Sequence, residues 1–373
     1  MQWRPAVVAG LMLMTGACAS DRPKPPVTPE SRASMPPALK PSVVTERVRQ
    51  DSDDPAIWLH PSDRAKSLIL GTDKGEDGAL YVFDLAGKIL KRFGGMRRPN
   101  NVDVEYGFSF GGVSIDIAVV TERNSGTIRV FRLPELEPID GGPLPVFEGE
   151  TQRAPMGVGL YKRPRDGAIF TILSRKSGRS GTYLWQYRIE AAGAGRVGLT
   201  RVRAFGAFSG GGSEIEAVAV DDALGYVYCA DEWKGVRKYH ADPEAVDASV
   251  ELSLFGTEGF RGDREGISIY GLDDGTGYIL VSDQQANRFH VFPREGMHGN
   301  PHAHPRLKLV PTSTIGSDGS EVTSASLGPA FPNGLFIAMT EGGTFQLYAW
   351  PALAGSDLVV ARDGARPGAG SRP

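Results

Sequence analysis

The sequence predicts an all-β protein folded as a six-bladed β-propeller, and three observations point to this fold. A unit of three strand-length segments recurs six times along the chain, and such self-similarity is typical of repeat architectures. The 373 residues include 48 glycines and 27 prolines, which suit turn-rich β structure better than helices. No comparable stretch shows the apolar spacing of a long amphipathic helix.

The three segments of each unit share a pattern. The last ends in aromatic or branched residues: "ALYVFDL" (79–85), "TIRVFRL" (127–133), "YLWQYRI" (183–189), "GVRKYHA" (235–241), "RFHVFPR" (288–294) and "TFQLYAW" (344–350). The middle one is apolar and ends in polar residues, as in "LILGTDK" and "YILVSDQ". The first begins near residues 53, 100, 155, 214, 264 and 321. β-Branched and aromatic residues bounded by Gly, Asp or Pro are typical of strands.

A fourth, less regular segment completes the blade, for example at 89–95 and 199–206. Residues 43–49, "VVTERVR", are expected to pair into the last blade and close the ring. Closure of this kind would protect a strand edge that otherwise invites aggregation. We therefore expect the propeller to span residues 43–352.

The N-terminus resembles a bacterial lipoprotein signal peptide that covers residues 1–18. Arg4 precedes "AVVAGLMLM" (6–14), which is too short to span a bilayer. "TGACAS" then places Cys18 where such signals carry the acylated cysteine. An ordinary cleaved signal with an incidental cysteine is the alternative. In either case the protein is expected to be exported, to the cell envelope (periplasm or outer membrane) or the medium, and to meet a membrane only through a lipid anchor.

The remaining ends and the composition add further expectations. The Pro-rich residues 19–42 are predicted to be a tether, and 353–373 a flexible tail. A net charge of −3, from 41 basic and 44 acidic residues, argues against a general nucleic-acid binder. Cys229, in "YVYCA", is expected to be a buried thiol because no disulfide framework exists. The protein is expected to be a monomer.

Oxygen-bearing side chains stand at matching strand ends of the repeats. Equivalent positions in a propeller lie at equivalent radii, so these side chains are expected to converge on one face near the axis. At or just before the first strands stand Asp53, Asp54, Asn100, Asn101, Asp103, Glu214, Glu216, Asp263, Glu265, Asp318 and Glu321, and after second strands stand Glu232 and Gln284.

Such a cluster predicts bound cations. Two carboxylates about 4 Å apart repel by about 4 kcal/mol at an effective dielectric near 20, so several pairs would rival the stability of a whole domain. Histidine and thiol ligands are missing from these strand ends, and oxygen donors suit calcium better than zinc. The alternative is that each acid caps its own turn. The register across four or five blades favours the metal cluster.

Basic residues occupy other strand ends: Lys74 in "GTDKG", Arg123 in "TERNSG", and Arg175 with Lys176 in "LSRKSG". A face that combines divalent cations with Lys and Arg suits a polyanionic, phosphate-bearing substrate. The alternative is that each is a solvated loop charge.

An ordered set of motifs resembles one family. "DDPAIWLHP", "GTDKG", "NNVDVEYGF", "EAVAVDDALGYVYCADE", "REGISIYGLDDGTGYILVSDQ" and "LGPAFPNGLFIA" appear in the order found in the bacterial β-propeller phytases, between about residues 45 and 351. The resemblance implies a six-bladed propeller that hydrolyses calcium-complexed myo-inositol hexakisphosphate (phytate) with several Ca²⁺ ions. It also implies a metal-activated water and no phosphoenzyme.

Site residues follow from the same resemblance, position by position. The implied metal ligands are Asp53, Asp54, Glu216, Glu232, Asp263, Glu265, Gln284 and Asp318. Of these, Asp53, Glu216 and Glu265 are expected to act in catalysis. Lys74, Arg123, and Lys176 or its neighbour Arg175 match phosphate-binding positions, where they would stabilise charge on the transferring phosphoryl group.

The chain also departs from the family pattern. Met156 replaces a usual tyrosine, Thr312 stands near a usual aspartate, and "AMTEGG", with Thr340 and Glu341, replaces a "Q-D-G" sequence. Fewer carboxylates predict weaker or fewer calcium sites. Two alternatives therefore stay open: a non-catalytic, tethered propeller that binds calcium or a phosphorylated ligand, and another propeller hydrolase such as a lactonase.

Overall fold

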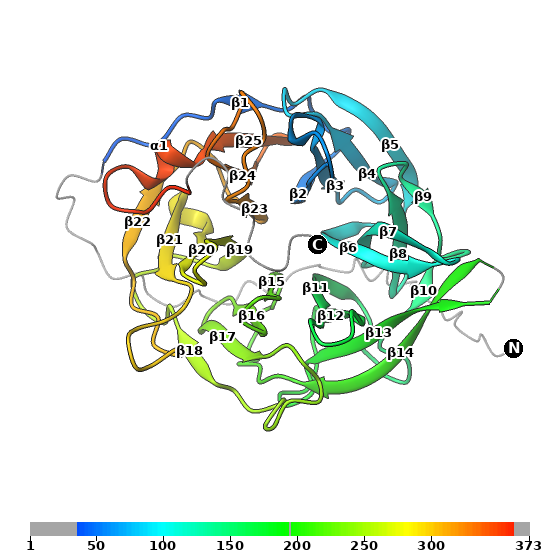
Figure 1. Ribbon diagram of the computed structural model, residues 1–373. Helices are drawn as coiled ribbons and strands as arrows, with labels where there is room; N and C mark the ends of the chain where they lie inside the picture. The colour runs from blue at the N-terminus through cyan, green and yellow to red at the C-terminus, as the bar shows by residue number, and fades with distance from the viewer. Residues whose placement is uncertain (1–35, 194, 362–373) are drawn as a thin grey trace, which may run out of the picture.

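The computed structural model describes residues 36–193 and 195–361, and these form six antiparallel sheets around a central axis (Figure 1). The innermost strand of each sheet contacts the innermost strand of the next, all the way around the ring. The predicted six-bladed β-propeller is confirmed.

The first three blades follow each other along the chain. Blade one contains β2 (Ser52–Trp58), β3 (Leu68–Asp73), β4 (Gly78–Phe83) and β5 (Ile89–Met96). Blade two contains β6 (Pro99–Phe110), β7 (Val113–Glu122), β8 (Thr127–Leu133) and the two short strands β9 (Glu137–Pro138) and β10 (Leu144–Pro145). Blade three contains β11 (Pro155–Lys162), β12 (Ile169–Arg175), β13 (Leu184–Ala192) and β14 (Arg196–Phe205).

The other three blades complete the ring. Blade four contains β15 (Val218–Asp221), β16 (Tyr226–Asp231), β17 (Gly235–His240) and β18 (Ser253–Phe255). Blade five contains β19 (Arg264–Gly271), β20 (Gly277–Asp283), β21 (Arg288–Pro293) and β22 (Lys308–Pro311). Blade six contains β23 (Ser320–Thr323), β24 (Leu335–Thr340), β25 (Thr344–Ala349) and β1 (Val43–Val44).

Helical structure in the described residues is limited to η1 (Arg64–Lys66), η2 (Gln284–Ala286) and α1 (Trp350–Ala354). None of these short helices is long and apolar enough to cross a membrane.

The core lies between neighbouring blades. Middle strands such as β4 are buried on both faces because each sheet is packed between two others, and this explains their unbroken apolar sequences. Where blades one and six meet, the rings of Phe83 and Phe345 pack edge to face with centroids 5.9 Å apart. Gly71 lies under the second ring, and a Cβ atom there would be 2.4 Å from Phe345. This close approach requires glycine.

The N-terminal strand closes the ring, as predicted. β1 pairs antiparallel with β25, with Val43 opposite Leu347. The backbone amide of Phe345 also donates a hydrogen bond to Thr45 Oγ1 at 2.9 Å. The last blade therefore takes its outermost strand from the start of the propeller domain, which joins the two ends of the ring.

The C-terminal segment differs from the expected tail. Residues 353–361 pack against blades five and six, and Leu353, Leu358 and Ala361 are buried there. The amides of Val359 and Ala361 donate to the hydroxyls of Tyr278 (2.7 Å) and Tyr270 (3.0 Å). The folded unit therefore continues beyond the predicted boundary at residue 352. The expected signal peptide with Cys18 lies outside the described residues.

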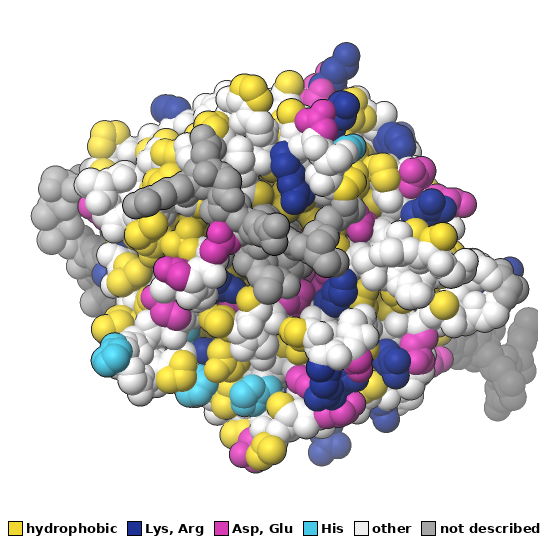
Figure 2. All heavy atoms as spheres, in the orientation of Figure 1, with side chains coloured by type: hydrophobic (Ala, Val, Ile, Leu, Met, Phe, Trp, Pro, Cys, Tyr) yellow, Lys and Arg dark blue, Asp and Glu magenta, His cyan; other side chains and the backbone are white. Residues whose placement is uncertain are grey.

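Charged side chains of both signs are interspersed over the face seen in Figure 2. This mixture agrees with the nearly balanced charge of the sequence. Cys229 is a free, fully buried thiol, as predicted.

Candidate active site

The residue that follows the second strand occupies an equivalent position in every blade. In each case its backbone amide donates a hydrogen bond of 2.8–3.2 Å to a backbone carbonyl that precedes the first strand of the same blade. The donor and acceptor pairs are Lys74 and Asp51, Arg123 and Arg98, Lys176 and Ala154, Glu232 and Glu214, Gln284 and Asp263, and Glu341 and Ile315. We call these six residues the turn positions. Blades one to three place cations there, and blades four to six place carboxylates or an amide. The turn positions on one face of the propeller are thus divided by charge, and we call this face the divided face.

The predicted ligands of blades five, six and one form one linked group on this face. Lys74 Nζ lies 2.8 Å from Asp53 Oδ1 and is also ion-paired with Asp318. Asp318 accepts a second hydrogen bond from the side-chain amide of Gln284. Side chains from three blades are therefore linked through Asp318, and the strand ends converge as the repeat predicted.

A second group lies at blade four. Oxygen atoms of Glu214, Glu216 and Glu232 all lie within 4.8 Å of one another. Glu214 is ion-paired with Lys176, which comes from blade three. The repeat placed Glu214 among the converging strand-end acids, but the family resemblance did not include it among the implied metal ligands.

Burial raises the pKa of these carboxyl groups, and their neighbours add to the effect. Desolvation, followed by the charges of Asp53, Asp318 and Glu214, raises the pKa of Glu216 to about 8. Desolvation together with Glu216 and Glu214 raises the pKa of Glu232 to about 9. Desolvation, followed by the charges of Glu216 and Glu232, places the pKa of Glu265 well above its usual value. Close carboxylates in a buried site thus disfavour their own ionisation.

Lys74 changes this balance for Asp53. Desolvation raises the pKa of Asp53 to about 7, and the nearby ammonium opposes the rise. Burial also opposes the charge of Lys74 itself, but Asp53 and Asp318 outweigh it and raise the pKa of that ammonium. Lys74 is therefore a stable positive charge among the acids.

The donor set fits calcium. Its members offer carboxylate and amide oxygens, the ligands that Ca²⁺ prefers. Glu214 Oε2, Glu265 Oε2 and Asn100 Oδ1 are buried and have no hydrogen-bond partner among the described residues. Buried oxygens without partners are costly unless something binds them. Asp54, Asp263 and Gln284 lie in the same set of strand ends and would complete the ligands.

Three of the four predicted phosphate-binding residues hold turn positions on this face. The fourth does not. Arg175 is fully buried, its guanidinium pairs with Glu150 at 2.9 Å, and it lies over the rings of Phe147 and Trp185. Successive side chains in a strand point to opposite sides, so Arg175 packs in the core while Lys176 reaches the face.

Two of the residues that depart from the family pattern are buried and contribute to packing and hydrogen bonding. Met156 is fully buried, and its carbonyl accepts a hydrogen bond from Thr121 Oγ1 at 2.8 Å. Thr312 is buried and its hydroxyl lies 2.7 Å from that of Thr314. Glu341, in contrast, is exposed at the turn position of blade six, so a carboxylate is retained there.

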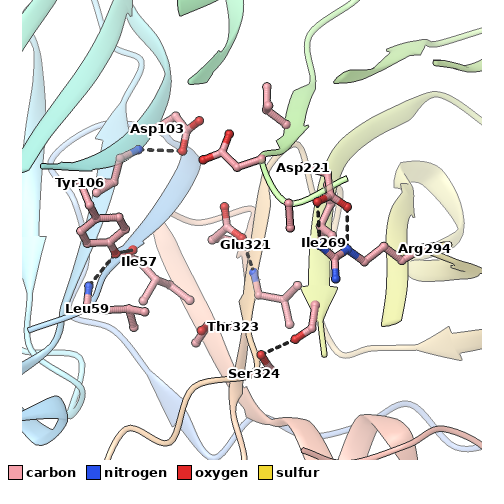
Figure 3. A pocket seen from close by; sticks show the side chains of 16 residues that line it. Ile57, Leu59, Asp103, Tyr106, Asp221, Ile269, Arg294, Glu321, Thr323 and Ser324 are labelled. Carbon is pink, nitrogen blue, oxygen red and sulfur yellow. Dashed lines mark hydrogen bonds and ion pairs between the residues drawn. The ribbon is translucent and has the colours of Figure 1, made fainter. Parts of the chain in front are cut away.

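The central channel carries more acids beyond the face. A cavity of about 220 Å³ is lined by Asp103, Tyr106, Asp222, Glu321 and the ion pair of Asp221 with Arg294 (Figure 3). Asp103 and Glu321 stand two or three residues further along their strands than the ligands at the mouth, so they point into the channel. Desolvation raises their pKa values to about 7 and about 8.

Comparison with known proteins identifies the family. The profile of the family described as "Phytase" matches residues 8–346. The chain belongs to the phytase family. The protein described as "3-phytase" of Bacillus subtilis (strain 168) is 31% identical over 321 residues, which are 81% of this chain and 80% of that protein. The family consists of phosphoric monoester hydrolases, so the face with the turn positions is the candidate active site of a phytase.

Solved structures with a similar shape include the Dos1 propeller (TM-score 0.40, 11% identity, 79% of this chain and 66% of that one). Another is BBS1N in complex with ARL6DN (TM-score 0.43, 11% identity, 79% and 77%).

Proposed function

We propose that this phytase-family chain releases phosphate from myo-inositol hexakisphosphate with calcium ions held among the acids of the divided face. The observation that carries the proposal is the division of the six turn positions. Three neighbouring blades present Lys74, Arg123 and Lys176, and the other three present Glu232, Gln284 and Glu341. A substrate with several phosphates, complexed with calcium, can meet both halves at once.

The residues have distinct roles in this proposal. Lys74, Arg123 and Lys176 donate to phosphate oxygens and hold the substrate's orientation. Asp53, Glu216 and Glu265 would hold the cations nearest the reacting phosphate, and the ligand set would be completed by Asp54, Glu232, Asp263, Gln284 and Asp318. Bound calcium would supply a water of lowered pKa and would neutralise phosphate charge.

The deciding experiment is phosphate release from phytate by the full chain, with calcium and with excess chelator. We expect release with calcium and loss of release with chelator. Calcium binding without any phosphate release would support the non-catalytic alternative. Hydrolysis of a lactone but not of phytate would support the lactonase-like alternative.

We also propose that the chain is exported and anchored through an acylated Cys18, and that it works as a monomer. The N-terminal sequence supports the anchor. Labelled palmitate should enter the wild-type chain in a bacterial host and should not enter the Cys18→Ser variant.

A further inference from the structure

Both lysines of the divided face are ion-paired with acids of the candidate calcium site. Lys74 Nζ contacts Asp53 Oδ1 at 2.8 Å and Asp318, and Asp51 lies 3.9 Å away. Lys176 contacts Glu214. The Lys74 side chain is 18% exposed and that of Lys176 is 42% exposed, so Lys74 is the more enclosed of the two. Arg123, at the third cationic turn position, has no carboxylate within ion-pair distance in the described part of the chain.

In these ion pairs, the ammonium groups and the carboxylates each occupy a partner that the proposed function needs for phosphate or for calcium. An ammonium has three donors, and in Lys74 carboxylates engage at least two of them. A lysine held in this way is poorly available to a phosphate. The oxygens that hold it are, in turn, the oxygens that a calcium ion needs. Ammonium and Ca²⁺ are therefore competitors for Asp53, Asp318 and Glu214.

We propose that Lys74 and Lys176 neutralise the calcium-binding carboxylates in the metal-free protein. When calcium binds, the two lysines leave these carboxylates and bind the phosphates of the substrate. The inference rests on the proposed function of this face and adds an order of events to it. Without calcium, the lysines neutralise the acids, and the polyanion finds neither calcium ions nor free lysine ammonium groups. With calcium, the acids are satisfied by the ion and the lysines turn to the substrate. Calcium must therefore bind to the acids of this face before the polyanion binds.

The test is a calorimetric calcium titration of the full chain after removal of bound metal. Lys74→Met is compared with Arg123→Met, which removes the same charge from an equivalent turn position of the neighbouring blade. Any long-range gain in calcium affinity from lost positive charge is therefore shared by both variants. Because charge-assisted hydrogen bonds to Asp53 and Asp318 need no longer be broken, we expect Lys74→Met to bind calcium about tenfold more tightly than Arg123→Met.

Lys176→Met provides a second variant in case Lys74→Met does not fold. Its side chain is more exposed and has one carboxylate partner, so we expect a smaller gain of about threefold over Arg123→Met. Equal calcium affinity in the lysine and Arg123 variants, or weaker binding in the lysine variants, would overturn the proposal.

Binding of myo-inositol hexasulfate, a polyanion that the chain is not expected to hydrolyse, gives the second readout. The wild type should bind it with calcium and at least about tenfold more weakly without calcium. Both Lys74→Met and Arg123→Met should weaken it in calcium. Binding that is equally tight with and without calcium would contradict the order of events. Neither readout depends on turnover, so a failure of phytate hydrolysis is seen separately in the phosphate assay.

Discussion

The amide of Glu232 donates to the carbonyl of Glu214 at 3.1 Å, and the amide of Glu214 donates back to the Glu232 carboxylate at 3.2 Å. This reciprocal pair joins the end of β16 to the loop before β15. It holds the two side chains beside Glu216, so three acids share one site. Backbone geometry thus imposes a proximity that the charges alone would oppose.

Replacement of Glu216 should separate activity from stability. In Glu216→Gln we expect calcium-dependent phosphate release to fall by about 100-fold or more, because a charge at the proposed calcium site is lost. The same change removes repulsion with Asp53, Asp318 and Glu214. In chelator at pH 8.5 the variant should therefore melt roughly 2 °C or more above the wild type.

The control is the melting temperature in saturating calcium, where the variant should lose its advantage because the ion no longer gains a full set of carboxylates. Wild-type turnover in Glu216→Gln would remove this residue from the site. An unchanged melting temperature in chelator would show that Glu216 is not repelled in the metal-free protein.

The stability of the metal-free protein should fall as pH rises. The pKa values of Asp53, Glu216 and Glu232 are raised to about 7, about 8 and about 9. A carboxyl group with a raised folded-state pKa stabilises the fold fully below its unfolded value, and this contribution is lost as pH rises through the folded value. Between the two values each group lowers the unfolding free energy by about 1.4 kcal/mol per pH unit.

Urea unfolding in chelator at pH 5.5, 7.0 and 8.5 measures this slope. We expect the free energy of unfolding to decrease across the series. Saturating calcium should flatten it, because the bound ion keeps the carboxylates ionised in the folded state. The same slope with and without calcium would mean that these groups do not face the ion.

The repeat was enough to predict the face, but not the depth of each residue. Every innermost strand begins on the same face, so Asp53, Glu216 and Asp318 could be brought together from strand ends alone. A difference of two residues moves Asp103 into the channel, and a difference of one places Arg175 in the core while Lys176 is on the face. Those distinctions depend on pleat and bulge positions, such as the register shift between Pro155 and Val158, which composition does not reveal.

The C-terminal segment was mispredicted for a different reason. Residues 353–361 form no periodic pattern, and their partners, Tyr270 and Tyr278, lie about 80 to 90 residues earlier in blade five. Contacts so distant in sequence leave no local signal. Glu214 was left out of the implied ligands because its place beside Glu216 depends on hydrogen bonds to Glu232, 18 residues further along the chain.

Arg175 should matter for stability and not for substrate binding. Arg175→Met removes a buried guanidinium and leaves Glu150 without its partner. Since Glu150 remains partly open to water, we expect a loss of about 2–3 kcal/mol in unfolding free energy, somewhat less than for a fully buried pair. The KM for phytate should stay within about twofold of the wild type, which is well under 1 kcal/mol.

Lys176→Met is the matched comparison at the adjacent position. It should raise the KM and, in saturating calcium, leave the unfolding free energy within about 0.5 kcal/mol of the wild type. If Arg175→Met raised the KM as much as Lys176→Met, the assignment of these neighbours to core and face would be wrong.

The junction of blades one and six should be sensitive to a single methyl group. In Gly71→Ala the new Cβ would lie 2.4 Å from the Phe345 ring, which is itself packed against Phe83 and cannot turn away freely. We expect a loss of about 1–3 kcal/mol in unfolding free energy from overpacking. Pairing the change with Phe345→Leu should recover part of that loss, because the smaller side chain makes room for the methyl group. Denaturant unfolding of both single variants and the double variant measures the coupling. Strictly additive losses would show that Gly71 and Phe345 do not meet across this junction.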